Sequence, residues 1–213
     1  MDRSFSMSGE KLNLARQAAR LFVTALAARR RGHGAGGGER DRDDHTASPG
    51  PGGRGDEVGR DPTVGHRRRL YDVIVKSLDM PYTKTRRRAL LAISDGFDRY
   101  SDTTAADVID RARRSDVLVY PVAIGKGRPP VLAELASVTG GHSFNVDDPK
   151  KLEATLSTIA RELRSQYLLG YAPARTPASE SEWRSIDVQI NRPGARVRAR
   201  DGYYSNVESS RSS

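Results

Sequence analysis

A 41-residue stretch with almost no apolar side chains, Arg29–Arg69, divides this sequence into two parts. Eleven of its residues are glycine and ten are arginine, and its only apolar residues are Ala35, Ala47, Val58 and Val64. A segment of this composition cannot bury enough surface to offset the entropy lost on ordering. We therefore predict that residues 29–69 are disordered and that any folded core comes from the residues on either side.

Apolar residues return on both sides of this stretch at spacings typical of regular secondary structure. Before it, apolar positions at helical spacing predict an amphipathic helix over about 10–28. After it, a similar pattern predicts a short helix over 70–78. The apolar runs 89–93 and 117–124 predict strands buried on both faces, and Pro121 indicates that the second strand ends or kinks there.

Strands and helices are expected to alternate along the rest of the chain. The expected elements are a helix capped by Asp102 or Thr103, a helix over about 131–138 that ends at Thr139-Gly140-Gly141, a strand over 142–145, a helix opened by Asp148 and Pro149, and a strand over 166–171. This alternation predicts an α/β fold with a parallel sheet and helices on both faces. The segments 183–190 and 196–200, with a turn signal between them, predict an antiparallel ribbon added to the sheet edge.

The composition excludes several kinds of chemistry. The chain has no cysteine, which excludes disulfides, thiolate metal sites and cysteine nucleophiles. No apolar run reaches the length of a membrane helix, and the first residues show no basic-then-apolar signal region. We therefore expect a basic protein, with a net charge of +9, without a membrane span or an export signal, and its compartment is left open.

The first candidate for binding chemistry is Asp95, just after the strand predicted over 89–93. Ligands of parallel sheets gather at the carboxyl ends of the strands, so this carboxylate is expected at the rim of a crevice. From this segment alone, the alternative is that Asp95 and Asp98 belong to an ordinary Asp-Gly turn.

The second candidate is the loop Asp2-Arg3-Ser4-Phe5-Ser6, which precedes the first predicted helix. Strict alternation places Asp2, Ser4 and Ser6 on one side of an extended loop. One carboxylate and two hydroxyls are hard oxygen ligands of the type that Mg²⁺ prefers, with water completing the octahedron. The loop therefore indicates a magnesium site, above all when it is combined with Asp95.

Six short runs of this sequence together show a known pattern. They are Asp2–Leu12, Leu70-Tyr71-Asp72, Ala92-Ile93-Ser94-Asp95-Gly96, Leu135-Ala136 with Thr139-Gly140-Gly141, Glu162–Tyr171 and Val197–Tyr204. With these runs the chain resembles a von Willebrand factor type A (vWFA) domain and, within that group, the vWFA-related proteins of Acidobacteria and neighbouring phyla. The resemblance covers about 7–28 and 70–205.

The resemblance implies a Rossmann-like sandwich with a metal-ion-dependent adhesion site (MIDAS) at the top of the sheet. Transferred by position, the family's ligands imply Asp2, Ser4, Ser6 and Asp95 as the residues that hold Mg²⁺ here. The metal of that site takes a carboxylate from a protein partner, so the implied function is non-enzymatic, adhesion-type protein binding. Relatives of this type are often extracytoplasmic.

Three features depart from the family pattern. No strand precedes Asp2, Arg68 stands where the family has a Thr ligand, and residues 29–69 replace two strands. A guanidinium at position 68 opposes metal binding by charge repulsion. We favour a shifted reading frame over 29–69, because shifted GC-rich codons yield Arg, Gly, Pro and Ala in excess; the competing account is a true disordered insertion.

These patterns divide the chain into five segments. They are a metal-loop remnant with the first helix (1–28), the Gly/Arg-rich segment (29–69), the vWFA core (70–172), the C-terminal β-ribbon (173–205) and a disordered tail (206–213).

Two other functions compete with protein binding. The net charge suggests a nucleic-acid-binding protein, although no recognition motif is present and we expect no nucleic-acid partner. A metal-assisted hydrolase using Asp95 is the third, and no second carboxylate pair or phosphate loop supports it.

Overall fold

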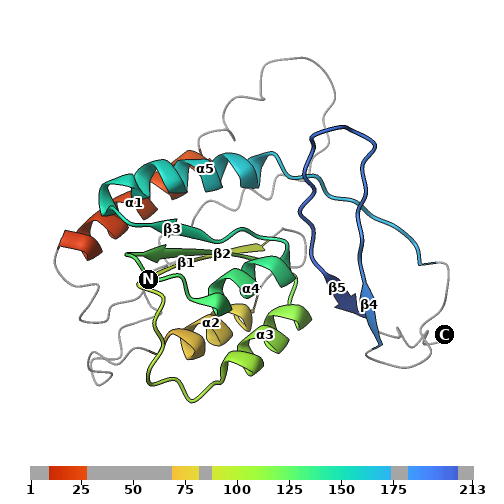
Figure 1. The fold of residues 1–213 in the computed structure, drawn as a ribbon, viewed down its shortest axis with the longest axis horizontal. Coiled ribbons are helices and arrows are strands. Elements are labelled where there is room, and N and C mark those ends of the chain that lie inside the picture. The colour runs from red at the N-terminus through yellow and green to blue at the C-terminus, as the bar shows by residue number, and fades with distance from the viewer. Residues whose placement is uncertain (1–9, 28–68, 82–87, 174–181, 206–213) are drawn as a thin grey trace, which may run out of the picture.

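The computed structural model describes residues 10–27, 69–81, 88–173 and 182–205. Within these ranges a three-stranded parallel sheet lies between two layers of helices, and a two-stranded antiparallel sheet lies beside them (Figure 1). The mixed α/β architecture predicted from the alternation of elements is therefore confirmed at this level. The disorder predicted for 29–69 falls almost wholly outside the described residues.

The elements follow the order expected from the sequence. The helices are α1 (Glu10–Ala27), α2 (Leu70–Leu78), α3 (Ala105–Arg114), α4 (Pro130–Thr139) and α5 (Leu152–Arg164), the last preceded by a 3-10 turn, η3 (Pro149–Lys151). The strands are β1 (Arg88–Ser94), β2 (Val117–Ile124), β3 (Phe144–Val146), β4 (Trp183–Ser185) and β5 (Gly202–Tyr204). None of the described helices is long and apolar enough to cross a membrane.

Strand β2 occupies the middle of the parallel sheet, between β1 and β3. It pairs with β1 along seven residues of each strand but with β3 only over Val122–Ile124. The expectation that Pro121 ends the second strand is wrong, because β2 continues to Ile124. Pro121 is tolerated since it lies outside the part of β2 that is paired on both sides.

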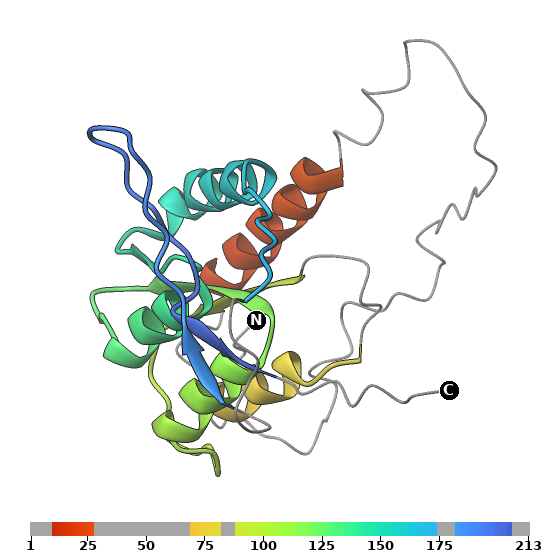
Figure 2. The same ribbon diagram turned by 90° about the vertical axis from the view of Figure 1, so that its right-hand side faces the viewer.

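Each face of the sheet is covered by its own apolar core. Successive residues of β2 point to opposite faces, so Val119 belongs to one core and Tyr120 to the other. Helices α2, α3 and α4 cover the first face, and α1 packs along α5 over the second (Figure 2). The amphipathic helix predicted over 10–28 therefore buries its apolar stripe, through Ala15 and Ala18, against the sheet layer.

The helix ends test the capping residues predicted from the sequence, and one prediction is wrong while two are confirmed. The predicted cap of α3 at Asp102 or Thr103 is wrong by one or two residues. Thr104 is the N-cap, because its hydroxyl accepts from the Asp107 N–H while the Asp107 carboxylate accepts from the Thr104 N–H. Gly140 ends α4 in the left-handed region, and the Asp148 carboxylate caps η3, both as expected.

The C-terminal ribbon forms a sheet of its own instead of joining the edge of the parallel sheet. Its strands pair only at their base, Trp183–Ser185 with Gly202–Tyr204. The ribbon is held by a helix end: the Arg200 guanidinium donates to the Arg113 and Ser115 carbonyls at the C-terminus of α3, at 3.0 and 3.1 Å. This contact with α3 explains why the expected docking on a strand edge is wrong.

The strand expected over 166–171 is absent from the structure. The side chains of Tyr167, Leu168, Leu169 and Tyr171 are 90%, 81%, 71% and 62% exposed. The local sequence has strand-forming residues, but a strand needs a neighbour to accept its hydrogen bonds. No described segment pairs with these residues, so the pattern alone does not produce a strand.

Candidate functional site

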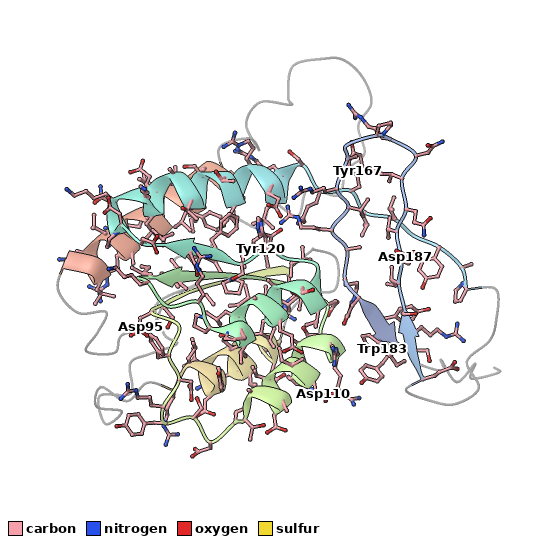
Figure 3. All side chains as sticks on the ribbon, viewed as in Figure 1. Asp95, Asp110, Tyr120, Tyr167, Trp183 and Asp187 are labelled. Atoms are coloured by element: carbon pink, nitrogen blue, oxygen red, sulfur yellow. The ribbon has the colours of Figure 1, made fainter. Side chains whose placement is uncertain are left out.

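The candidate site lies at the carboxyl edge of the parallel sheet, where β1 ends and the chain turns at Asp95 (Figure 3). The Ser94 hydroxyl accepts from the Gly96 N–H at 3.0 Å, and the Asp95 carboxylate accepts from the Phe97 N–H at 3.3 Å. Gly96 has a φ of +84°, and a methyl group there would meet the Pro129 ring at 2.4 Å. The Asp-Gly turn weighed from the sequence is thus present, and it fixes Asp95 at the rim.

The loop that follows Asp95 is bound to the N-terminus of helix α2. The Asp98 carboxylate accepts from the Tyr71 N–H at 3.1 Å, and the Ser101 hydroxyl accepts from the Asp72 N–H at 3.1 Å. The N-cap residue Arg69 offers no side-chain cap of its own. Asp98 and Ser101 therefore satisfy two of the orphan N–H groups of α2 from a distant part of the chain.

Helix α2 returns the interaction through Asp72. Its carboxylate accepts from the Thr103 N–H at 2.9 Å and from the Asp102 N–H at 3.2 Å, and it forms an ion pair with Arg69 at 3.4 Å. Burial raises the pKa of Asp72, but the hydrogen bonds from Thr103 and Asp102 and the charge of Arg69 outweigh it and hold the pKa below the usual value. Asp72 is therefore ionised at neutral pH.

These contacts bring together two of the runs on which the family resemblance depends. Leu70-Tyr71-Asp72 and the Asp95–Gly96 turn are far apart in the sequence, yet the loop 95–103 connects them at one edge of the sheet. Sequence reasoning considered Asp98 only as part of a turn and did not anticipate that it binds α2. The Asp-rich composition of 95–102 was the available signal.

Of the four predicted metal ligands, the structure describes only Asp95. Asp2, Ser4 and Ser6 lie outside the described residues, as does Arg68. Within the described ranges, no three or more His, Cys, Asp or Glu side chains are grouped so as to hold a metal ion. The structure therefore does not test the predicted ligand set, and the magnesium site stays a prediction.

The other side of the rim is formed by the loop between β2 and α4. Its backbone is anchored where the Gly125 N–H donates to the Val146 carbonyl of β3 at 2.9 Å. The Phe97 ring lies on Gly127: a methyl group at Gly127 would meet the ring at 3.0 Å. The two loops of the carboxyl edge are therefore in direct contact, and Lys126 and Arg128 flank the contact in the sequence.

A polar cluster that sequence reasoning missed ties the C-terminal ribbon to the second core. The hydroxyl of Tyr120 donates to the Glu162 carboxylate at 2.9 Å, and Arg198 of the ribbon forms an ion pair with the same carboxylate at 2.7 Å. Burial, and then the hydrogen bond to Glu162, raise the pKa of Tyr120 well above its usual value. The cluster holds the ribbon against α5.

The aromatic residues of the C-terminal part divide into packed and unpacked ones. Trp183 and Tyr204 meet edge to face at 4.9 Å between ring centroids, and Tyr171 meets Tyr203 at 6.3 Å. Four of the five aromatic residues in this part of the chain therefore contact another aromatic ring. Tyr167 is the exception because it is almost fully exposed.

No family model and no curated protein matches the chain. Among solved structures, it is similar to an uncharacterized membrane spanning protein from Vibrio fischeri, with 18% identity and a TM-score of 0.35. The match covers 43% of this chain and 51% of that one, so the chain spans about half the length of its structural neighbour. A likeness at this level carries no argument about function.

Proposed function

We propose that this chain is a non-enzymatic protein-binding module of the vWFA type, which holds Mg²⁺ at the carboxyl edge of its sheet and binds a partner's carboxylate there. The observation that carries the proposal is the position of Asp95. This carboxylate directly follows a strand of a parallel sheet that has helices on both faces, on a turn fixed by Gly96. Such edges are where open α/β sheets bind their ligands.

The donor set is chemically suited to magnesium. Asp2, Ser4, Ser6 and Asp95 supply oxygen atoms only, and Mg²⁺ prefers hard oxygen donors and retains several waters. A retained water leaves a position that a partner's carboxylate can take. Arg68 brings a positive charge to the position of a family ligand, so we expect weaker binding than a Thr at that position would give.

The proposal is tested by titrating Mg²⁺ into the full chain by isothermal calorimetry. We expect one Mg²⁺ per chain and a rise in Tm as Mg²⁺ is added. Asp95→Asn keeps an oxygen that accepts from the Phe97 N–H but removes the charge, so it should abolish the heat of binding. The matched control is Asp187→Asn on the C-terminal ribbon, far from Asp95 (Figure 3).

Two results would contradict the proposal. One is a wild-type chain that takes up no Mg²⁺ at millimolar concentration. The other is an Asp95→Asn variant whose Mg²⁺ isotherm matches that of the wild type and of Asp187→Asn. Circular dichroism of each variant shows whether the fold itself has been retained.

A further inference from the structure

An apolar and cationic patch lies beside Asp95 on the same edge of the sheet. We define the rim patch as Phe97, Lys126 and Arg128. The Phe97 side chain is 49% exposed although it is a large apolar group, and its ring lies on Gly127, whose neighbours in the sequence are the two cationic residues. Aromatic residues are enriched at protein–protein interfaces relative to the rest of the surface.

The rim patch is held in place by the backbone on both sides. Gly96 lies so close to Pro129 that a methyl group there would overlap the Pro129 ring, and the Gly125 N–H is bound to β3. The Phe97 N–H is bound to the Asp95 carboxylate. A backbone fixed in this way loses little conformational entropy when a partner binds.

The cations of the rim patch have no ion-pair partner among the described residues. Both Lys126 and Arg128 are exposed, whereas Arg69, at the opposite side of the same edge, is paired with Asp72 and Asp102. Their charges are therefore available to an acidic partner.

The aspartates at the same edge limit which kind of anionic partner can bind to the rim patch. They are Asp95, Asp98, Asp102, Asp147 and Asp148. Asp98 and Asp102 are bound to α2 and Arg69, and Asp148 caps η3. A nucleic-acid backbone carries a negative charge at every nucleotide, so these carboxylates would repel it while the two cations attract it. A peptide can place its carboxylates opposite Lys126 and Arg128 alone and an apolar side chain on Phe97.

We propose that the rim patch binds an acidic segment of a partner protein that also presents an apolar or aromatic side chain to Phe97. This inference deepens the proposed function and rests on it for the place of the partner, since the patch adjoins Asp95. On this inference, the protein recognises more of its partner than the carboxylate that binds the metal. The residues next to that carboxylate in the partner should include at least one further acid and one large apolar side chain.

The test uses a random dodecapeptide display library selected on the immobilised full chain in Mg²⁺. We expect enrichment of peptides that combine Asp or Glu with Phe, Tyr, Trp or Leu. One enriched peptide, synthesised with a fluorescent label, is then the probe for anisotropy titrations. Lys126→Glu with Arg128→Glu should weaken its binding about tenfold or more, and higher salt should weaken wild-type binding.

Two further variants separate charge from packing and from misfolding. Phe97→Ser should weaken binding of the same probe while leaving its salt dependence unchanged, because it removes apolar contact only. The matched control, Lys76→Glu with Arg161→Glu, changes the net charge equally on exposed helix positions away from this edge and should leave binding unchanged.

The outcomes distinguish this inference from the proposed function. Binding that needs the rim patch but survives EDTA and Asp95→Asn would support the inference and contradict the metal site. Binding that needs Mg²⁺ and Asp95 but tolerates the Lys126 and Arg128 reversals would do the opposite. The inference is overturned if no acidic peptides are enriched, or if oligothymidylate binds the wild type more tightly than the peptide does.

Discussion

The rim loop after β1 and the C-terminal arm, residues 166–173 and 182–205, are irregular apart from the short strands β4 and β5 of the arm, yet they are held to very different degrees. The rim loop exchanges hydrogen bonds with α2 in both directions, through Asp98 and Asp72. The arm is held by Arg200 at the base of the ribbon and by the ion pair between Arg198 and Glu162, while Tyr167 to Tyr171 are largely exposed. The difference teaches that an irregular segment is fixed by the partners of its polar groups and not by its apolar content.

The largest expected effect in this comparison comes from a single methyl group. Gly96→Ala should lower the free energy of unfolding by about 3 kcal/mol, because it places a Cβ at positive φ and against the Pro129 ring. Gly170→Ala in the arm meets nothing within 4 Å and should leave stability unchanged or raise it by a few tenths of a kcal/mol. Urea unfolding of both variants followed by circular dichroism measures the difference. Equal stabilities would show that the rim is no more tightly held than the arm.

A smaller effect is expected from the carboxylate that joins the rim loop to α2. Asp98→Ala should lower the free energy of unfolding by about 1–2 kcal/mol, since the Tyr71 N–H loses its acceptor and the N-cap residue Arg69 provides no side-chain acceptor in its place. Asp187→Ala in the arm removes a carboxylate that only the Gln189 side chain contacts among the described hydrogen bonds. We expect it to change stability by less than about 0.5 kcal/mol. A rim variant as stable as the arm variant would refute the capping role of Asp98.

Elements whose partners follow from local periodicity could be predicted from the sequence. Helices 10–28 and 70–78 and strand 117–124 are confirmed within a residue of their bounds. Each of these elements packs an apolar stripe or run into one of the two cores, together with neighbouring helices and strands. The cap of α3 was missed because Asp102, Thr103 and Thr104 are all good capping residues, and only Thr104 has an acidic residue three positions later.

The site was less predictable than the fold. The sequence pointed correctly to a turn at Asp95, because Asp-Gly after an apolar run is a local signal. The link between Asp98 and Tyr71 joins residues 27 positions apart, and no periodicity encodes it. The arm failed as a strand for the same reason: its pairing depends on a neighbour that residues 166–171 do not specify.

The smallest expected effect concerns the exposed part of the arm. Leu168→Ser with Leu169→Ser should change the free energy of unfolding by less than about 0.5 kcal/mol, because both side chains are already largely in water. Leu156→Ser on α5, where the side chain is buried, is the reference and should cost about 3 kcal/mol or more. Urea unfolding and light scattering check both. If the arm variant lost as much stability as Leu156→Ser, the side chains of residues 168 and 169 would have to be buried in solution. The rim and the arm would then differ in what they pack against, and the arm would be held as firmly as the rim.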